Sequence, residues 1–226
     1  MKLVENLKSK LIVSCQAPSD SPLNNAEIIG TIAQTCVNRG AAGVRIDTPA
    51  HIIAVRKKMP YISIIGLWKQ TGLGTPVYIT PRYEDAVAVA EAGADIIAID
   101  ATLRERPQGE TPAEIIGKIH DRFGKLVMAD VDNLESAIAA VEVGADLVGT
   151  TLFGYTSATQ HLSPPGFILL SELVEKLSVP IICEGGIASP DMAKQALDLG
   201  AYAVVVGTAI TGIDALTKSF QKIVHS

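Results

Sequence analysis

A short phrase occurs four times along the chain and limits the architectures that the chain can adopt. Each copy has a Gly-Ala pair at its second and third positions, shortly before an apolar stretch; the copies occupy residues 39–47, 92–100, 143–150 and 199–207. Their leading glycines are 53, 51 and 56 residues apart. A glycine followed at once by an apolar stretch is typical of a helix that ends and passes into a buried strand. A spacing of this size indicates two strand–helix units for each copy.

Four more apolar stretches fill the intervals, at residues 10–16, 61–68, 125–130 and 179–184. Helical patterns separate the stretches, with Asn133 and Ser189 as predicted N-caps. Eight alternating units predict an α/β protein in which residues 1–226 form a single (β/α)8 TIM barrel, with a short N-terminal helix at residues 3–7 under the barrel floor. An open Rossmann-like sheet is disfavoured because no Gly-x-Gly-x-x-Gly follows the first strand.

The composition argues against several classes of function. The net charge is −5 and no basic cluster is present, so nucleic-acid binding is not expected. No apolar stretch is long enough to span a membrane, and the first ten residues lack the apolar core of a signal peptide. We therefore expect a cytoplasmic protein with no membrane partner. Small barrels often pair, which favours a homodimer.

The cysteines and histidines show no pattern of metal ligands. The cysteines are Cys15, Cys36 and Cys183, an odd number without metal or redox spacing, as is usual in a reducing compartment. The histidines are His51, His120, His161 and His225, and we expect them on the surface or in loops. The sequence predicts neither a metal nor a cofactor.

In a (β/α)8 barrel the chemistry takes place at the carboxyl ends of the strands, so those ends give the candidate residues. They are Ser14, Gln16, Arg45, Asp47, Lys69, Asp100, Asp130, Asp132, Thr150, Thr151, Glu184, Gly207 and Thr208.

The last two strands both end in glycine, at Gly185-Gly186 and at Gly207-Thr208. Glycine lets the backbone approach a ligand closely, and free N–H groups at the start of a helix attract anions. Two such ends on consecutive late strands are typical of a phosphate site, although each alone is compatible with ordinary turn chemistry. The sequence therefore predicts a small phosphorylated ligand.

Lys69 closes a strand that is apolar on both faces, where lysine is uncommon unless it is paired or functional. Partial burial among cations lowers the pKa of a lysine towards roughly 7–8, which suits a general base, and a neutral amine can also form a Schiff base. A structural pair with Asp100 is an equally good explanation of the residue taken alone.

Glu184 precedes the first glycine pair. Taken alone it is slightly better explained as a structural helix-terminus carboxylate, but opposite a lysine it becomes a candidate for proton transfer. Arg45 and Asp47 share one face of their strand, so the sequence leaves two equal explanations open for them, a structural ion pair and contact with a substrate. The long polar segment at residues 153–165 suggests a flap over the site, and Trp68 is expected to pack.

Several strings resemble the N-acetylmannosamine-6-phosphate 2-epimerase family over about residues 9–220. The most specific are Ser14-Cys15-Gln16 and the segment that ends in Gly154-Tyr155-Thr156. Others are Gly43-Val44-Arg45-Ile46, Ile65-Gly66-Leu67-Trp68-Lys69-Gln70, Val77-Tyr78-Ile79-Thr80-Pro81, Ala98-Ile99-Asp100-Ala101-Thr102, Met128-Ala129-Asp130 and Glu184-Gly185.

The resemblance implies an enzyme that inverts C2 of a phosphorylated amino sugar and uses neither metal nor nucleotide. It also implies proton transfer by Lys69 with help from Glu184, and sugar contacts by Gln16, Arg45 and Asp130. One departure concerns the phosphate, because Gly212 and Gly186 stand where many members carry basic residues. This departure predicts a cradle made mostly of backbone N–H groups, or another cation.

Two other functions remain compatible with the residues. One is a different phosphate-binding barrel enzyme with a Schiff-base lysine, of the aldolase or synthase type. The other is a non-catalytic sensor of sugar phosphates.

Overall fold

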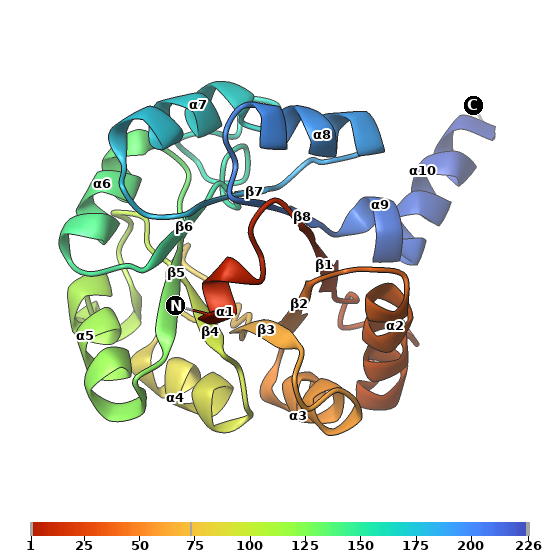
Figure 1. Cartoon of the computed structure of the whole chain (residues 1–226), viewed down its shortest axis with the longest axis horizontal. Helices are drawn as coiled ribbons and strands as arrows, with labels where there is room; N and C mark the ends of the chain where they lie inside the picture. Colours follow the sequence, from red (N-terminus) through yellow and green to blue (C-terminus); the bar gives the residue numbers. More distant parts are fainter. Residues whose placement is uncertain (1, 73, 225–226) are drawn as a thin grey trace.

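Each predicted apolar stretch forms a strand in the computed structural model, which describes residues 2–72 and 74–224. The strands are β1 (Leu11–Cys15), β2 (Gly43–Asp47), β3 (Ser63–Leu67), β4 (Ile96–Asp100), β5 (Leu126–Asp130), β6 (Leu147–Gly149), β7 (Ile181–Glu184) and β8 (Ala203–Val206). They pair in parallel in chain order and β8 pairs with β1, so the sheet closes into a barrel (Figure 1). The predicted (β/α)8 fold is confirmed.

The helices between consecutive strands surround the barrel on the outside (Figure 1). They are α2 (Ala26–Asn38), α3 (Pro49–Lys58), α4 (Tyr83–Glu91), α5 (Pro112–Phe123), α6 (Leu134–Glu142), α7 (Phe167–Lys176) and α8 (Pro190–Asp198). The predicted N-caps are confirmed, because Asn133 Oδ1 accepts from Ser136 N at 2.8 Å and Ser189 Oγ accepts from Met192 N at 3.2 Å. A 3-10 turn, η1 (Pro107–Gly109), lies in the segment before α5.

The four repeated glycines explain why the phrase recurs. Gly40, Gly93, Gly144 and Gly200 have φ values of 104°, 104°, 103° and 97°. This backbone conformation suits glycine because a Cβ would be strained there. Each of these glycines turns the chain from the end of a helix into the next parallel strand.

The floor of the barrel is closed by the start of the chain. The short helix α1 (Lys2–Glu5) lies slightly before the predicted residues 3–7 and across one barrel end (Figure 1). Leu7 is fully buried among inward-facing side chains such as Ile12 and Val205. Ser9 N donates to Tyr202 O at 2.7 Å, which fixes this segment beside β8. The barrel interior is therefore a packed core at this end.

After β8 the chain forms α9 (Thr208–Thr211) and then α10 (Ile213–Val224). Figure 1 shows α10 pointing away from the barrel rather than lying against it. Its apolar residues are exposed, including Ile213 (55%), Phe220 (72%) and Val224 (76%), and none of its described residues is buried.

The expectation that the histidines lie on the surface or in loops is wrong for His51. This residue is 7% exposed in the first turn of α3, and burial lowers its pKa. His120 lies on α5 with its Nε2 2.8 Å from Asp146 Oδ2, and His161 is exposed in a loop. His225 lies outside the described residues. Across residues 2–72 and 74–224, no helix is both long and apolar enough to cross a membrane.

Candidate active site

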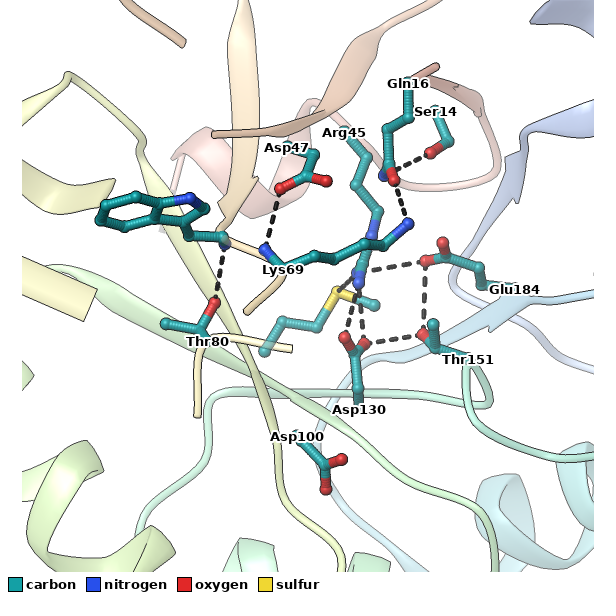
Figure 2. Close-up of polar contacts among 12 residues, drawn as sticks. Ser14, Gln16, Arg45, Asp47, Lys69, Thr80, Asp100, Asp130, Thr151 and Glu184 are labelled. Carbon is teal, nitrogen blue, oxygen red and sulfur yellow. Dashed lines mark hydrogen bonds and ion pairs between the residues drawn. The ribbon is translucent and has the colours of Figure 1, made fainter. Parts of the chain in front are cut away.

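Polar side chains from several strands meet at the carboxyl end of the barrel (Figure 2). They are Ser14, Gln16, Arg45, Lys69, Asp130, Thr151 and Glu184. All belong to the strand ends that the sequence nominates, and parallel closure brings those ends to one face.

Arg45 lies at the centre of the cluster and joins two carboxylates. Its Nη2 is 2.5 Å from Asp130 Oδ2 and its Nη1 is 3.2 Å from Asp130 Oδ1, so this contact is bidentate. The same Nη1 lies 3.2 Å from Glu184 Oε2. Burial alone lowers the pKa of Arg45, but Asp130 and Glu184 outweigh it and leave the pKa above its ordinary value. Arg45 is therefore a permanent cation that fixes both acids.

Of the two explanations, the ion pair between Arg45 and Asp47 is wrong. Asp47 Oδ1 instead accepts a hydrogen bond from the backbone N–H of Lys69 at 2.9 Å. Arg45 is 1% exposed and Asp130 is fully buried, so each of these charges needs the other. Asp47 lies at a partly solvated strand end and does not need a cation in the same way.

Lys69 lies two residues beyond β3, in a segment that folds back on itself. Lys69 and Ile79 form an antiparallel bridge, and Thr80 N donates to Trp68 O at 2.9 Å. The side chain of Lys69 then extends to Gln16, with Nζ 2.5 Å from Gln16 Oε1 (Figure 2). Gln16 Nε2 in turn donates to Ser14 Oγ at 2.9 Å. The amine is thus held above the Arg45 cluster by contacts at both ends of the residue.

The environment of Lys69 favours loss of its proton. Desolvation is the main cause that lowers its pKa below the ordinary value; Asp47 opposes the shift and Arg45 adds to it. The residue as a whole is exposed at the open mouth, so water still moderates this effect. A ligand that fills the mouth removes that water and strengthens the lowering.

Glu184 has the complementary behaviour. Burial raises its pKa to about 7, Arg45 opposes the rise, and Asp130 adds to it. Its side chain is 12% exposed, enough to meet a ligand at the mouth. Near neutral pH the group therefore holds and releases a proton with little cost in free energy, as a proton shuttle must.

The two glycine ends lie side by side because β7 and β8 pair through Glu184 and Val205. Within the described chain, the amides of Gly185, Gly186 and Gly207 donate to no other backbone or side-chain acceptor. Gly186 has φ 70°, and a Cβ there would lie 2.7 Å from Pro164. A basic side chain at this position therefore has no room beside Pro164.

Gly212 is restricted in the same way. A Cβ at this position would lie 2.7 Å from the Cα of Thr208. Thr208 begins α9, with Gly207 at its N-cap. Side-chain bulk is therefore excluded at both Gly186 and Gly212.

Some predicted candidates lie outside the cluster. Asp100 pairs with Arg104 at 2.5 Å and not with Lys69, and Figure 2 shows it apart from the other acids. Asp132 accepts from Ser136 and Thr156, and so anchors the loop before α7. Thr150 Oγ1 donates to Glu184 O at 2.8 Å and has a structural role between β6 and β7.

Sequence reasoning missed Arg104, whose Nε also donates to Thr102 Oγ1 and whose Nη1 donates to Pro76 O. Arg104 lies four residues after Asp100, and this spacing could have indicated the ion pair between them. It also missed Thr80, which is fully buried, has φ 42° and accepts from Trp68 N at 3.0 Å. No local sequence pattern indicates that Thr80 holds the segment around Trp68 and Lys69 in place. Trp68 is half-buried against the outer core, so its packing role is confirmed.

The predicted flap is anchored by buried hydroxyl groups. Thr156 Oγ1 donates to Asp132 Oδ2 at 2.7 Å and lies 3.0 Å from Thr159 Oγ1. Tyr155 is 54% exposed and lies close to Gly185, since a Cβ there would be 3.5 Å from its ring. The loop thus borders Gly185; its movement remains a prediction.

The arrangement combines an amine of lowered pKa, an acid whose pKa is raised to about 7, and backbone N–H groups without acceptors at the described ends of β7 and β8. These are the parts of a proton-transfer site for an anionic substrate. Among the described residues, no cluster of three histidine, cysteine or acidic side chains is placed to bind a metal ion.

Comparisons with known proteins agree with this chemistry. A family model, NanE, described as "Putative N-acetylmannosamine-6-phosphate epimerase", matches residues 29–226. A protein of Thermosynechococcus vestitus named "Putative N-acetylmannosamine-6-phosphate 2-epimerase" is 62% identical over 220 residues, which cover 97% of this chain and 95% of that protein.

Solved structures extend the comparison. The N-acetylmannosamine-6-phosphate 2-epimerase from Clostridium perfringens superposes with a TM-score of 0.93 at 40% identity, covering 98% of this chain and 96% of that one. A 3-hexulose-6-phosphate synthase from Salmonella typhimurium has a TM-score of 0.65 at 20% identity, with 90% of each chain covered, and shares the fold alone. The chain belongs to the NanE family of N-acetylmannosamine-6-phosphate epimerases.

Proposed function

We propose that the chain is an N-acetylmannosamine-6-phosphate 2-epimerase that forms N-acetylglucosamine 6-phosphate by inversion at C2. This places it in the breakdown of sialic acid and related amino sugars. The proposal covers the whole chain, residues 1–226, as one catalytic barrel domain. The observation that carries it is the amine of Lys69, held over an acid cluster beside the glycine ends of β7 and β8.

The C2 proton of the closed sugar ring is not acidic. Opening the ring exposes an aldehyde at C1, and the C2 proton then lies next to a carbonyl group. We assign to Glu184 the proton that moves during ring opening and closure, since its pKa of about 7 permits both directions. Neutral Lys69 removes the C2 proton, and return of a proton to the opposite face inverts the centre. No step in this scheme needs a metal or a cofactor.

The other residues bind the substrate in this scheme. Gln16, Arg45 and Asp130 form the polar floor that is proposed to contact the sugar. Gly185, Gly186, Gly207 and Thr208 are proposed to bind the phosphate through their N–H groups. The phosphate holds the sugar in place while C2 becomes planar, so binding energy remote from C2 supports the chemical step.

Exchange of the C2 hydrogen tests the reaction directly. The enzyme is incubated with N-acetylmannosamine 6-phosphate in deuterated water and followed by proton NMR. We expect loss of the C2 signal together with the appearance of the gluco sugar. Binding without exchange would support a sensor, and a borohydride-trapped adduct at Lys69 would support a Schiff-base enzyme.

We also propose that the protein acts as a homodimer through α10. The exposed apolar residues Ile213, Leu216 and Phe220 recur at helical spacing, and Ile210 on α9 extends the stripe. A pair of twelve-residue helices buries too little surface for a stable interface of about 1,200–2,000 Å², so a partner must also cover neighbouring surface. A second copy can do so, because a two-fold axis uses the same patch on both chains.

We propose the cytoplasm as the compartment of the protein. Sedimentation at micromolar protein concentration, in a buffer of cytoplasmic pH and salt, tests the dimer. We expect a dimer for the native chain and a monomer for Phe220→Asp. The matched control is Ile53→Asp, since Ile53 is 56% exposed on α3, away from the stripe. A monomeric native chain, or a dimeric Phe220→Asp variant, would refute the assignment to α10.

A further inference from the structure

The hydroxyl group of Thr151 lies between the two acids of the cluster. Its Oγ1 donates to Asp130 Oδ1 at 2.7 Å and lies 3.4 Å from Glu184 Oε2 (Figure 2). Thr151 follows the end of β6, and its neighbour Thr150 ties the backbone of Glu184 to the same strand. Both the hydroxyl group and the carboxyl group that it faces are therefore held by one strand pair.

Asp130 and Glu184 share their hydrogen-bond donors. Arg45 Nη1 lies 3.2 Å from Asp130 Oδ1 and 3.2 Å from Glu184 Oε2, and Thr151 Oγ1 faces the same two oxygens. A hydroxyl group carries only one proton, so it cannot donate fully to both acids at once. The shorter distance shows that Asp130 receives it in this structure.

This sharing makes the contact between Thr151 and Glu184 depend on where the protons are. When Glu184 is protonated, its O–H can donate to the Thr151 oxygen while Thr151 donates to Asp130. When Glu184 is ionised, the Thr151 hydroxyl group can turn towards it, because Asp130 keeps the bidentate contact with Arg45. A hydrogen bond to the ionised form favours that form.

We propose that Thr151 is a positioning residue for the acid–base step, and that its hydroxyl proton turns between Asp130 and Glu184 as Glu184 loses and regains its own proton. The inference rests on the proposed function only for the role of Glu184 in turnover. The contact itself is a property of the free protein. Thr151 acts through Glu184 and needs no contact with the sugar.

Carbon-13 NMR of the glutamate carboxyl groups in the free protein tests the contact without any substrate. The Glu184 resonance is assigned by its loss in Glu184→Gln. In Thr151→Val, which keeps the shape and removes the hydroxyl group, we expect the titration midpoint of Glu184 to rise by roughly half to one pH unit. Thr151→Ser should restore the native midpoint. An unchanged midpoint in Thr151→Val, or no restoration by serine, overturns the proposal.

Turnover gives the second measurement. Thr151→Val should lower kcat about tenfold with little change in KM, as expected for a group that acts through Glu184. In the Glu184→Gln background the same substitution should have no further effect, because the residue through which it acts has gone. An equal tenfold loss in both backgrounds overturns the proposal. Absence of turnover in the native enzyme would instead refute the proposed function, and the titration would still decide the contact.

Discussion

The amine of Lys69 lies 2.5 Å from the side-chain oxygen of Gln16, so the segments that follow the third and first barrel strands meet above the acid cluster. This contact aims the amine across the mouth of the barrel towards the segment after β1. Gln16 is itself held by Ser14 at 2.9 Å, which limits the positions that the amine can take. The proposed proton acceptor is thus directed by the segment after β1.

Removal of the amine should stop the reaction and leave the fold intact. Lys69→Ala is expected to lower kcat/KM by at least about 10²–10⁴-fold, the usual contribution of one positioned proton-transfer group. The measurement is the rate of epimerisation, with thermal unfolding as the check on folding. Lys57→Ala, at an exposed lysine of α3, is the matched control. Near-native activity of Lys69→Ala would rule out the central assignment.

The buried ion pair should make Arg45→Met one of the most destabilising substitutions in the barrel. It leaves Asp130 fully buried without its cation, which typically costs about 3–5 kcal/mol of unfolding free energy. The double variant Arg45→Met with Asp130→Leu removes the unpaired charge and should recover part of that loss. Urea unfolding of the native protein, the single variant and the double variant measures these differences in unfolding free energy. A double variant less stable than Arg45→Met would show that the ion pair is not the cause.

Glu184 should make the stability of the native protein depend on pH. Folding raises the pKa of Glu184 from 4.5 to about 7. Between pH 4.5 and about pH 7, Glu184 is therefore protonated in the folded state and ionised in the unfolded state. The contribution is fully present below pH 4.5 and is lost as pH rises through about 7. Relative to Glu184→Gln, which does not titrate, the native protein should lose on the order of 3 kcal/mol between pH 4 and pH 8. Parallel stability curves for the two proteins would contradict the assignment.

Gly186 should tolerate no side chain. Its φ of 70° and the Pro164 atoms 2.7 Å from a Cβ predict that Gly186→Ala loses roughly 1–3 kcal/mol of stability and raises KM for the phosphorylated sugar. Gly117→Ala is the control, because Gly117 lies within α5 with no atom within 4 Å of a Cβ. That control should gain about 0.5–1 kcal/mol. Calorimetry and initial rates measure both effects, and equal responses at the two glycines would contradict the prediction.

The barrel was predictable from the sequence because its signals are local. A glycine such as Gly93 ends one helix, and the apolar stretch of β4 follows shortly after it. Each strand–helix unit can therefore be recognised from a few neighbouring residues. The choice of partners within the site was not local. Arg45 and Asp47 are two residues apart, yet Arg45 pairs with Asp130 from a strand 85 residues away. Arg45 pairs with Asp130 because closure of the barrel buries both charges. That burial cannot be read from the local sequence.

Lys69 was predictable as a functional residue, but the segment that positions it was not. An apolar strand that ends in lysine indicated a functional residue, and the structure places its amine in the cluster. The fold-back segment that presents it depends on Thr80, whose strained backbone has no sequence signature. The direction of α10 was equally hidden, because a helical pattern does not say whether the helix lies against its own barrel.

Among the described residues, α1 and Leu7 close the floor of the barrel, so the clustered polar side chains are reached from the carboxyl ends of the strands. Whichever epimer is inside must leave by the route through which the next molecule enters. In the proposed reaction the two sugars therefore compete for the same entrance, and accumulation of either slows conversion of the other. Net flow through the enzyme is then governed by how quickly later steps clear one of them away.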